Sequence, residues 1–384
     1  MCSERKETLK KELIKNFGEG DICYLSTPGR IELIGNHTDH QGGRVVACAI
    51  NIDNLFCFRK NETNEIRIID HQMGTIVVSL DDVAYKEEEK NTSVSLIKGI
   101  ANRLNDLGYK IGGFSGICDS RVLPGSGISS SACFEMMIVE CFNKLYCDNK
   151  LDIVTKAKIG QYAENVYFGK PSGLMDELAI AAGGVLAIDF FDEEPIINKL
   201  DFSFVDYGYS LVLVNTKADH SNLTNEYANI TKEMKEVANA LGQDKLSKID
   251  EETFYSYISL LRNKLNNDRA LLRAIHYFEE DKRADKLAKA MENKNINECL
   301  KLINESGNSS YKYLQNVYSS SSLDIQPLSL ALALSEKALN GKGAIRVHGG
   351  GFAGTILGII PNDLLDEYKK TLENVFGKDS VTIV

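Results

Sequence analysis

Three glycine-rich segments, each beside a predicted strand or helix, constrain the fold of this chain more than any other feature. They occupy residues 28–43 (PGRIELIGNHTDHQGG), 123–146 (LPGSGISSSACFEMMIVECFNKLY) and 344–360 (AIRVHGGGFAGTILGII). Glycine lets the backbone turn sharply or approach a ligand closely. We therefore expect a fold that brings loops from distant parts of the sequence around a ligand.

The first segment combines hydrogen-bonding side chains with turn glycines just before a predicted strand. Asn36, His37 and Asp39 offer both donors and acceptors, as a ligand with several hydroxyl groups requires. A plain polar loop is the alternative, but it does not explain the density of polar side chains after Gly35. The segment therefore indicates a site for a polyhydroxylated ligand.

The second segment is a glycine–serine loop that runs directly into an apolar helix. Backbone N–H groups at a helix start, together with the helix dipole, form an anion site. Three successive serines add hydroxyl donors, although the spacing matches neither the P-loop GxxxxGK[ST] nor GxGxxG. From this loop alone, phosphate binding and a structural serine N-cap are equally good interpretations.

In the third segment, a predicted strand enters three consecutive glycines and another strand leaves. A hairpin turn needs only one or two glycines, so the backbone is expected to pack against a ligand or another loop. A tight turn between buried strands is the alternative. A fourth segment, residues 163–184 (AENVYFGKPSGLMDELAIAAGG), holds Asp176 in an apolar frame, twelve residues after Glu164. That carboxylate is either structural or catalytic.

Overall composition narrows the classes of function. The chain has 384 residues and a formal net charge of −10, which argues against general nucleic-acid binding, so an anionic ligand needs a local site. No apolar run approaches the roughly 18 residues of a membrane span, and the charged start lacks a signal-peptide core. Nine cysteines without a CxxC pair fit free thiols in a reducing compartment. We expect a cytoplasmic protein.

Hydrophobic periodicity predicts strands and helices in both halves of the chain. Residues 224–302 are predicted to be mostly helical, and a further helix is expected at 327–340, with proline at its start and Gly341 just past its end. We predict two α/β or α+β layers of similar size, divided near residues 192–206. The predicted strands are 44–50, 65–69, 75–80, 113–118, 184–188, 210–214, 344–347 and 355–360.

Together, the four segments resemble the galactokinase branch of the GHMP small-molecule kinases. The family patterns GRxNLIGEHTDYxxG, PxGxGLSSSA, CGIMDQ and GGGFGG are similar to GRIELIGNHTDHQGG, PGSGISSSA, SGLMDE and GGGFAG here. They occur in the family's order at suitable spacing, and the match extends from about Tyr24 to the C-terminus. The resemblance implies a two-domain α+β GHMP kinase fold with its active site in the interdomain cleft. Residues 1–200 would be ribosomal-protein-S5-domain-2-like, and residues 201–384 ferredoxin-like.

The resemblance also implies an activity. The protein would transfer the γ-phosphate of ATP to the anomeric hydroxyl of α-D-galactose. Asp176 would accept or orient the hydroxyl proton, and Arg30 would stabilise that carboxylate and the developing phosphoryl charge. A guanidinium there would lower the pKa of Asp176 and keep it ionised at neutral pH.

The remaining site residues follow from the same resemblance. Ser131 and Glu164 would hold Mg²⁺, which prefers hard oxygen ligands. The ATP phosphates would lie against Pro124, Gly125, Ser126, Gly127, Ser129, Ser130 and Ser131. The sugar would contact Asn36, His37, Asp39, Gly173 and Tyr227. The expected partners are sugar and ATP, with neither nucleic acid nor membrane, for a monomer or weak dimer.

The chain departs from the family pattern mainly around the sugar. Asn36 stands where glutamate is usual, and Glu32 where asparagine is usual; His40, Ser172 and Ala353 replace tyrosine, cysteine and glycine. The change at position 36 leaves N-acetylgalactosamine and galacturonate as alternative substrates. A non-catalytic sensor of sugar and ATP is a further alternative, disfavoured because the chain keeps the SSSA serines and the catalytic pair.

Overall fold

The computed structural model describes residues 2–122, 127–218, 223–352 and 354–384. Its contacts define two compact units: unit 1 is Met1–Arg30 with Ala49–Gly183, and unit 2 is Ile31–Cys48 with Gly184–Val384. Two strands, β1 (Cys23–Ile34) and β2 (Arg44–Lys60), contribute residues to both units. The two units are not continuous in sequence, so they differ from the predicted domains, residues 1–200 and 201–384. That division stays a prediction.

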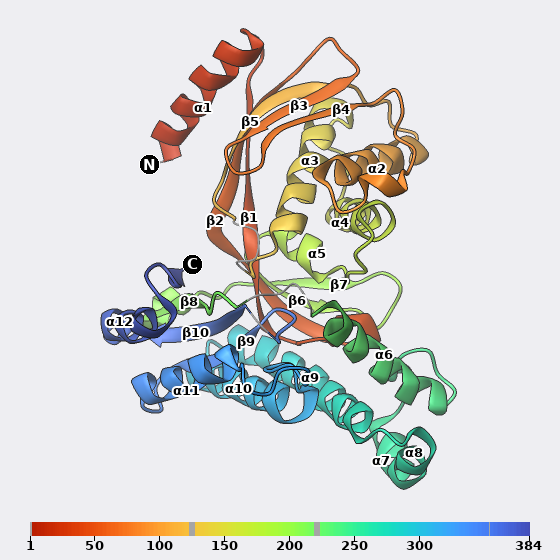
Figure 1. Cartoon of the computed structure of the whole chain (residues 1–384), viewed down its shortest axis with the longest axis vertical. Coiled ribbons are helices and arrows are strands. Elements are labelled where there is room, and N and C mark those ends of the chain that lie inside the picture. Colours follow the sequence, from red (N-terminus) through yellow and green to blue (C-terminus); the bar gives the residue numbers. More distant parts are fainter. Residues whose placement is uncertain (1, 123–126, 219–222, 353) are drawn as a thin grey trace. The chain divides into compact units, whose positions relative to one another are not determined.

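Unit 1 is a sheet with helices on both faces, α1 on one and α2 to α5 on the other (Figure 1). Its strands lie in the order β4-β3-β5-β2, with β3 and β5 parallel and the other neighbours antiparallel. Besides β1 and β2, its elements are α1 (Cys2–Phe17), β3 (Glu65–Asp70), β4 (Gly74–Ser79), α2 (Ser93–Asp106), β5 (Phe114–Ser120), α3 (Ser130–Tyr146), α4 (Ile153–Tyr162), the π-helical turn η3 (Ala163–Phe168) and α5 (Met175–Ala182).

Alternation along β2 explains why both faces of this sheet are covered. Successive strand side chains point to opposite faces, and the run from Leu55 to Phe58 is apolar at every position. Leu55 and Cys57 pack against α1. Phe56 and Phe58 stack on each other and contact Phe114, whose ring in turn meets an aromatic ring of α3. Each fully buried side chain of this size contributes about 1.5–3 kcal/mol, so the helices that carry site residues rest on a rigid sheet.

Unit 2 contains a four-stranded antiparallel sheet in the order β11-β8-β10-β9, and the first part of β2 pairs with β6, which pairs with β7. Its elements are β6 (Val185–Asp189), β7 (Ile196–Leu200), β8 (Tyr209–Asn215), α6 (Thr224–Ala240), α7 (Glu251–Ser256), α8 (Ile258–Leu265), α9 (Asp268–Glu292), α10 (Ile296–Ser309), α11 (Pro327–Leu339), β9 (Ala344–His348), β10 (Thr355–Pro361), α12 (Leu365–Phe376) and β11 (Val381–Ile383).

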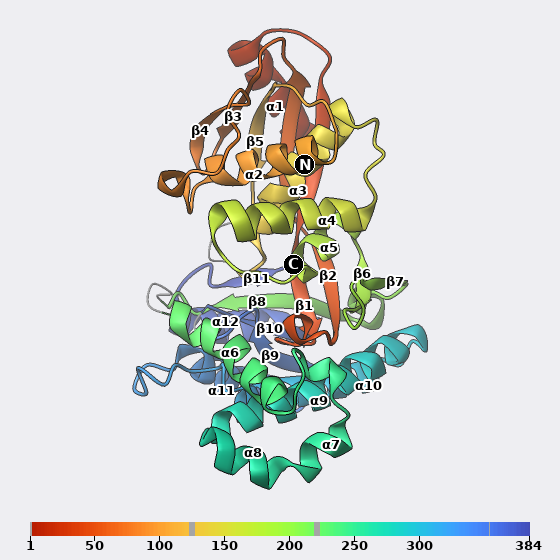
Figure 2. The same cartoon turned by 90° about the vertical axis from the view of Figure 1, so that its right-hand side faces the viewer.

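Two hydrophobic clusters hold unit 2 together. One joins the four-stranded sheet to α11 and α12, through side chains such as Val212, Ile356 and Leu328. The other joins α6 and α9, which lie side by side in Figure 2, through Ile230 and Ala274. The glycine turn between β9 and β10 is therefore anchored at both ends by packed strands.

The secondary structure confirms most of the sequence predictions. All eight predicted strands are present, and the mostly helical stretch becomes α6 to α10. Helix α11 begins at Pro327 and ends with Asn340 in the left-handed conformation (φ 46°), one residue before Gly341. The strand β1 was not predicted, because its Pro28 and Gly29 are typical of turns. It forms because Ile31 and the following apolar residues are fully buried.

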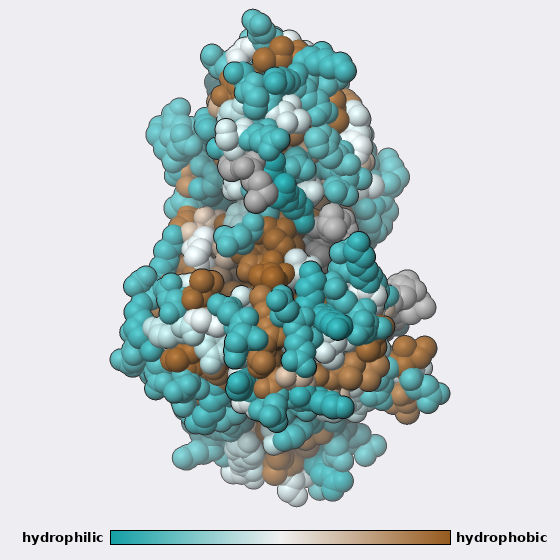
Figure 3. All heavy atoms as spheres, turned by 90° about the vertical axis from the view of Figure 1, so that its left-hand side faces the viewer, coloured by the Kyte–Doolittle hydropathy of each residue, from teal (hydrophilic) through white to brown (hydrophobic). Residues whose placement is uncertain are grey.

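The surface is mostly hydrophilic on the face that Figure 3 shows. Hydrophobic side chains gather in smaller areas of this face. No helix in the described ranges has both the length and the apolar character needed to cross a bilayer. The eight cysteines whose side chains are described are all free thiols, as the sequence predicted.

Candidate active site

Arg30 and Asp176 form a bidentate ion pair in unit 1. Asp176 lies in the first turn of α5, and Arg30 ends the part of β1 that belongs to this unit. Arg30 Nε donates to Asp176 Oδ1 at 2.6 Å and Nη2 donates to Oδ2 at 2.7 Å, while Nη1 donates to the Gly127 carbonyl at 2.9 Å. The Ser129 hydroxyl also donates to Oδ2. The sequence prediction that Arg30 lies beside Asp176 is thus confirmed.

The surroundings of Asp176 keep it ionised. Burial by itself raises the pKa of this carboxyl, but the Arg30 guanidinium, the Ser129 hydroxyl and the Lys170 charge together lower the pKa below its ordinary value. The start of a helix further favours an anion. The side chain is 27% exposed, so an ionised carboxylate of fixed orientation is open to a ligand.

The start of α3 tests the structural interpretation of the glycine–serine loop. Ser129 precedes the helix in the left-handed conformation (φ 63°), and its side chain does not cap the helix. Its hydroxyl is directed to Asp176 instead. The structural N-cap interpretation is therefore wrong for Ser129. Ser130 begins α3 and Gly127 is described (φ 78°), whereas Pro124, Gly125 and Ser126 lie outside the described residues, as does Ala353.

Ser131 and Glu164 lie together, as expected of a shared cation site. Ser131 Oγ donates to Glu164 Oε1 at 2.9 Å, and Lys170 Nζ lies 2.8 Å from the same oxygen. Glu164 is 2% exposed and sits on η3, where the wider helical turn follows α4. Lys170 was not predicted as a site residue; its only signal was its position between Glu164 and Asp176.

In unit 2, Asn36 is the centre of a buried hydrogen-bond network. Its Nδ2 donates to Glu32 Oε1 at 3.1 Å and to the Gly349 carbonyl at 2.9 Å, and its Oδ1 accepts from Asn316 Nδ2 at 2.7 Å. The residue is 1% exposed. Glu32, for its part, is paired with the fully buried Arg346 at 2.9 Å. In this arrangement the Asn36 amide bonds to protein, and the Glu32 carboxylate is held by Arg346.

The three-glycine turn between β9 and β10 packs against side chains of other elements. His37, at φ 60°, lies with its Nε2 3.2 Å from the Gly350 carbonyl, and the Tyr227 hydroxyl donates to the Gly351 carbonyl at 3.0 Å. A β-carbon at Gly350 would collide with the Tyr227 ring. The sequence left a ligand or another loop as the reason for the glycines, and the structure shows packing against protein.

The predicted site residues therefore fall into two sets. Unit 1 brings together Arg30, Ser129 and Asp176, with Gly127, and separately Ser131 with Glu164. Unit 2 brings Asn36, His37 and Tyr227 onto the glycine turn, and Asp39 begins the adjacent 3₁₀ turn η1 (Asp39–Gln41). Gly173, assigned to the sugar, belongs to unit 1, three residues before Asp176.

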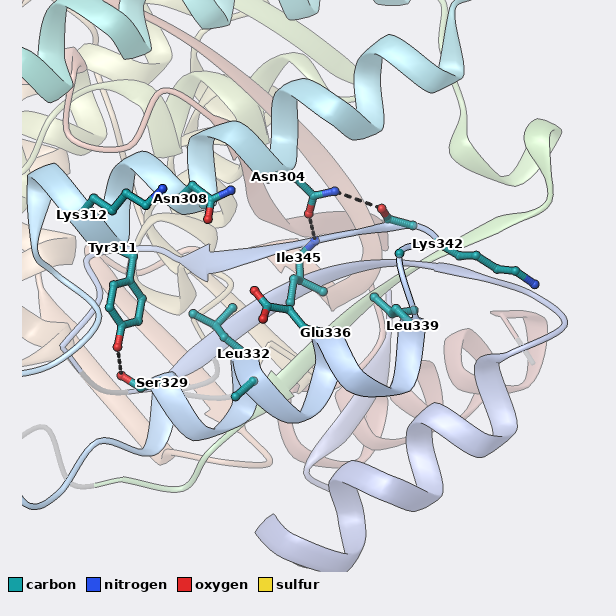
Figure 4. A pocket seen from close by; sticks show the side chains of 14 residues that line it. Asn304, Asn308, Tyr311, Lys312, Ser329, Leu332, Glu336, Leu339, Lys342 and Ile345 are labelled. Atoms are coloured by element: carbon teal, nitrogen blue, oxygen red, sulfur yellow. Dashed lines mark hydrogen bonds between the residues drawn. The ribbon is translucent and has the colours of Figure 1, made fainter.

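Unit 2 also has a separate surface pocket of about 550 Å³ between α10 and α11 (Figure 4). Asn304 donates to the Gly343 carbonyl at 3.1 Å and accepts from the Ile345 amide at 3.0 Å. These bonds fix the connection from α11 to β9. The lining includes none of the residues that the sequence assigned to a site.

Comparisons with known proteins identify the family of this chain. A family model described as the galactokinase galactose-binding signature matches residues 11–60, and one described as the GHMP kinases N terminal domain matches residues 95–184. Among curated relatives, a galactokinase of Clostridium tetani is 31% identical over 380 residues, covering 96% of this chain and 92% of the relative. A galactokinase of Clostridium perfringens is 29% identical over 390 residues, covering 97% and 94%.

Solved structures show the same fold. Lactococcus lactis galactokinase complexed with galactose superimposes with a TM-score of 0.83 at 23% identity, covering all of this chain and 97% of the other. Methanococcus jannaschii mevalonate kinase gives a TM-score of 0.66 at 18% identity, covering 95% and 98%. The two-domain α+β GHMP kinase fold is thus confirmed. With the full-length relationship at 31% identity, the chain belongs to the galactokinase family of the GHMP kinases.

Proposed function

We propose that this kinase transfers the γ-phosphoryl group of ATP to the anomeric hydroxyl of α-D-galactose, giving galactose 1-phosphate and ADP. The observation that carries the proposal is the Arg30–Asp176 pair, joined by Ser129 to the start of α3. The pair supplies a carboxylate for the sugar hydroxyl and a cation for the phosphoryl group at one place. Phosphoryl transfer needs mainly such positioning and charge stabilisation.

Asp176 would orient the anomeric hydroxyl and take its proton late in the transfer. Its lowered pKa makes it a weak base for a neutral hydroxyl. In a loose transition state, however, the acceptor oxygen becomes strongly acidic only as the new P–O bond forms. By that stage the bond from the γ-phosphorus to the bridging oxygen is largely broken; the proton passes to Asp176, and ADP leaves. Arg30 would stabilise the charge on the transferring group.

Ser131 and Glu164 would hold Mg²⁺ on the ATP phosphates. A hydroxyl and a carboxylate in hydrogen-bond contact, beside a helix start, form the hard oxygen set that this ion prefers. When bound, Mg²⁺ would neutralise phosphate charge. Lys170 is placed to add a further positive charge near Glu164. We include Gly127, Ser129 and Ser130 in the phosphate site, together with the residues Pro124, Gly125 and Ser126.

For the sugar, we propose contacts from His37, Asp39, Gly173 and Tyr227, with Asn36 orienting them. The exchange of Glu32 and Asn36 relative to the family pattern retains one carboxylate in this network, now bonded to both Arg346 and Asn36. This arrangement supports galactose over galacturonate, because the network does not offer the unpaired cation that a sugar carboxylate would need. We further propose a cytoplasmic monomer or weak dimer.

A coupled ADP-release assay over galactose, N-acetylgalactosamine, galacturonate and glucose tests the substrate. Galactose is expected to give the highest kcat/KM, with galactose 1-phosphate as the product by NMR. Asn36→Glu is the informative variant, since it restores the family's carboxylate. If Asn36 admits a sugar acid, this variant should have a lower turnover of galacturonate and an unchanged turnover of galactose. Phosphorylation of galacturonate with none of galactose overturns the proposed substrate. Binding without any turnover establishes a sensor instead.

A further inference from the structure

Three glutamates of unit 1 form a compact buried cluster. Glu135 lies on α3, Glu164 on η3 and Glu177 on α5, and one carboxylate oxygen from each lies within 4.8 Å of the others. All three residues are buried. Nothing in the proposed phosphoryl transfer uses Glu135 or Glu177.

A second observation shows that the carboxylates of two of the three glutamates have no hydrogen-bond partner in the ranges that the structure describes. Glu135 and Glu177 are each 0% exposed, and within the described part of the chain none of their four carboxylate oxygens has a hydrogen-bond partner. Buried polar groups in native proteins almost always have partners, and buried charges are paired or bind metals. Two buried carboxylates without described partners, each with one oxygen in the same cluster, therefore point to a missing ligand.

The local charges define what that ligand must carry. Asp176 is paired with Arg30, and Glu164 with Lys170. Glu135 and Glu177 remain, with two negative charges that no described side chain pairs. One divalent cation balances them. Burial, followed by the charge of Glu164, raises the pKa of both carboxyls well above the ordinary value, so protons are the alternative occupants.

The sequence around the cluster is consistent with a cation. Position 177 carries glutamate where the family pattern CGIMDQ has an uncharged glutamine. Gly160 of α4 faces the same place: a β-carbon there would lie 3.3 Å from both Glu135 Oε2 and Glu177 Cγ, and closer still to Met136. This chain thus adds a carboxylate, and it keeps the neighbouring position free of a side chain.

We propose that Glu135, Glu164 and Glu177 bind a hard divalent cation, Mg²⁺ or Mn²⁺, in the absence of nucleotide. All-oxygen carboxylate sites suit these ions. The inference extends the proposed function, because Glu164 would be shared with the cation that Ser131 helps to hold on ATP. Carboxylates that serve two ions are usual in two-metal phosphoryl-transfer sites.

Mn²⁺ binding to the EDTA-treated full-length chain without nucleotide tests the proposal, with free Mn²⁺ measured by electron paramagnetic resonance. We expect one Mn²⁺ bound per wild-type chain. Glu177→Gln should weaken that binding at least tenfold, because it removes one charged ligand while restoring the family's residue. Glu140→Gln is the matched control: Glu140 lies on the same helix α3 as Glu135, pairs with Lys156 and is outside the three-glutamate cluster, so this change should leave nucleotide-free binding nearly unchanged.

The outcomes separate this inference from the proposed kinase activity. Glu177→Gln should still phosphorylate galactose at saturating Mg·ATP, and its circular dichroism should match wild type. If that variant does not fold, Glu135→Gln takes its place in the titration. Absence of nucleotide-free Mn²⁺ binding in wild type, or equal binding by wild type and the variants at Glu177 and Glu135, overturns the cation site and leaves protons on the two glutamates. Neither result bears on galactose turnover, which the ADP-release assay measures independently.

Discussion

The site residues of unit 1 are mostly charged, whereas those of unit 2 are mostly amides, imidazoles and backbone carbonyls. In unit 1, Arg30 binds Asp176 and Lys170 binds Glu164. The Asp176 and Lys170 side chains are 27% and 57% exposed. In unit 2, Asn36 and Arg346 are 1% and 0% exposed. Asp176 and Lys170 are thus open to ligands, whereas Asn36 and Arg346 are built into the core.

This difference matches two separate chemical tasks. Phosphoryl transfer needs charges that can respond to the substrate, so the unit 1 groups must remain accessible. Recognition of a sugar needs donors and acceptors held in fixed directions, which a buried hydrogen-bond network provides at low cost in entropy. We therefore expect substitutions in unit 1 to affect turnover first and those in unit 2 to affect stability first.

The largest expected effect is on turnover, from Asp176→Asn. Asparagine keeps the shape of the side chain but cannot accept the hydroxyl proton, and loss of such a group typically lowers the rate about 10²–10⁴-fold. ATP binding should change little, since the carboxylate acts on the sugar. Steady-state kcat and ATP binding by calorimetry are the measurements. The adjacent Glu177→Gln serves as control, and near-normal kcat in Asp176→Asn would remove Asp176 from the mechanism.

A loss of stability is expected in unit 2 from Glu32→Gln, similar in free energy to the effect of Asp176→Asn on the rate. The change leaves the Arg346 guanidinium buried without its carboxylate partner, and breaking a buried pair in this way costs about 3–5 kcal/mol. Urea denaturation measures the free energy of unfolding. Glu298→Gln, which breaks the exposed Glu298–Lys301 pair of α10, is the matched control and should cost less than about 1 kcal/mol.

The combined exchange Glu32→Asn with Asn36→Glu sharpens this test. It restores the family's order of the two residues and keeps one carboxylate in the network. If the two arrangements are equivalent, the double variant should be more stable than Glu32→Asn alone. If the unfolding free energies lost in the two single variants simply add in the double variant, Arg346 cannot reach a carboxylate at position 36.

A smaller effect, on the use of nucleotide, is expected from Ser131→Ala in unit 1. It removes the hydroxyl that bonds Glu164, and loss of a metal-site partner commonly costs about 10–100-fold in metal affinity or activity. The apparent KM for Mg·ATP should rise while galactose binding stays constant. Equal weakening of both substrates would indicate instead that α3 is misfolded, which circular dichroism detects.

Local motifs indicated the candidate site residues of unit 1. Arg30, Asp176, Ser131 and Glu164 each lie in a segment whose pattern is readable over about ten residues. The existence of β9, the glycine turn and β10 followed from periodicity in the same way. The predicted strands were right because alternation and turn residues agree locally with the tertiary fold.

The network of unit 2 was not predictable in that way, because its members meet only after folding. Arg346 lies 314 residues from Glu32, and Asn316 lies 280 residues from Asn36. Neither Arg346 nor Asn316 stands in a pattern that indicates its partner. The resemblance implied that Asn36 contacts the sugar, whereas burial directs the side chains of both Asn36 and Glu32 into the protein. Glu177 was visible in the motif, yet its lack of a partner emerges only from packing.

The smallest expected effect is a difference in how the two units respond to pH, and it depends on His276. This fully buried side chain lies between the Ser309 hydroxyl and the Asn36 carbonyl, at 2.9 Å from each. A neutral ring satisfies both, accepting from the hydroxyl through Nδ1 and donating to the carbonyl through Nε2. Burial lowers the pKa of His276, and the positive charges of Arg283 and Arg346 lower it further. The negative charge of Glu280 raises this pKa, but by less than burial lowers it.

A histidine with a lowered folded-state pKa stabilises the protein above its unfolded value of about 6.5, and that stability is lost as the pH falls toward the folded pKa. His40, whose pKa burial lowers to about 4, acts in the same direction. Each unit of pKa depression is worth about 1.4 kcal/mol. Raised carboxyl pKa values at Glu135 and Glu177 have the opposite effect on stability, so unit 1 should gain stability as these two carboxylates protonate.

Hydrogen exchange at pH 7 and 5, corrected for intrinsic rates and with EDTA present, should therefore show protection falling in α9 and β9 but not in α3 and α5. His276→Gln should flatten the response of unit 2, and equal loss of protection in both units would contradict the assignment of acid sensitivity to its histidines.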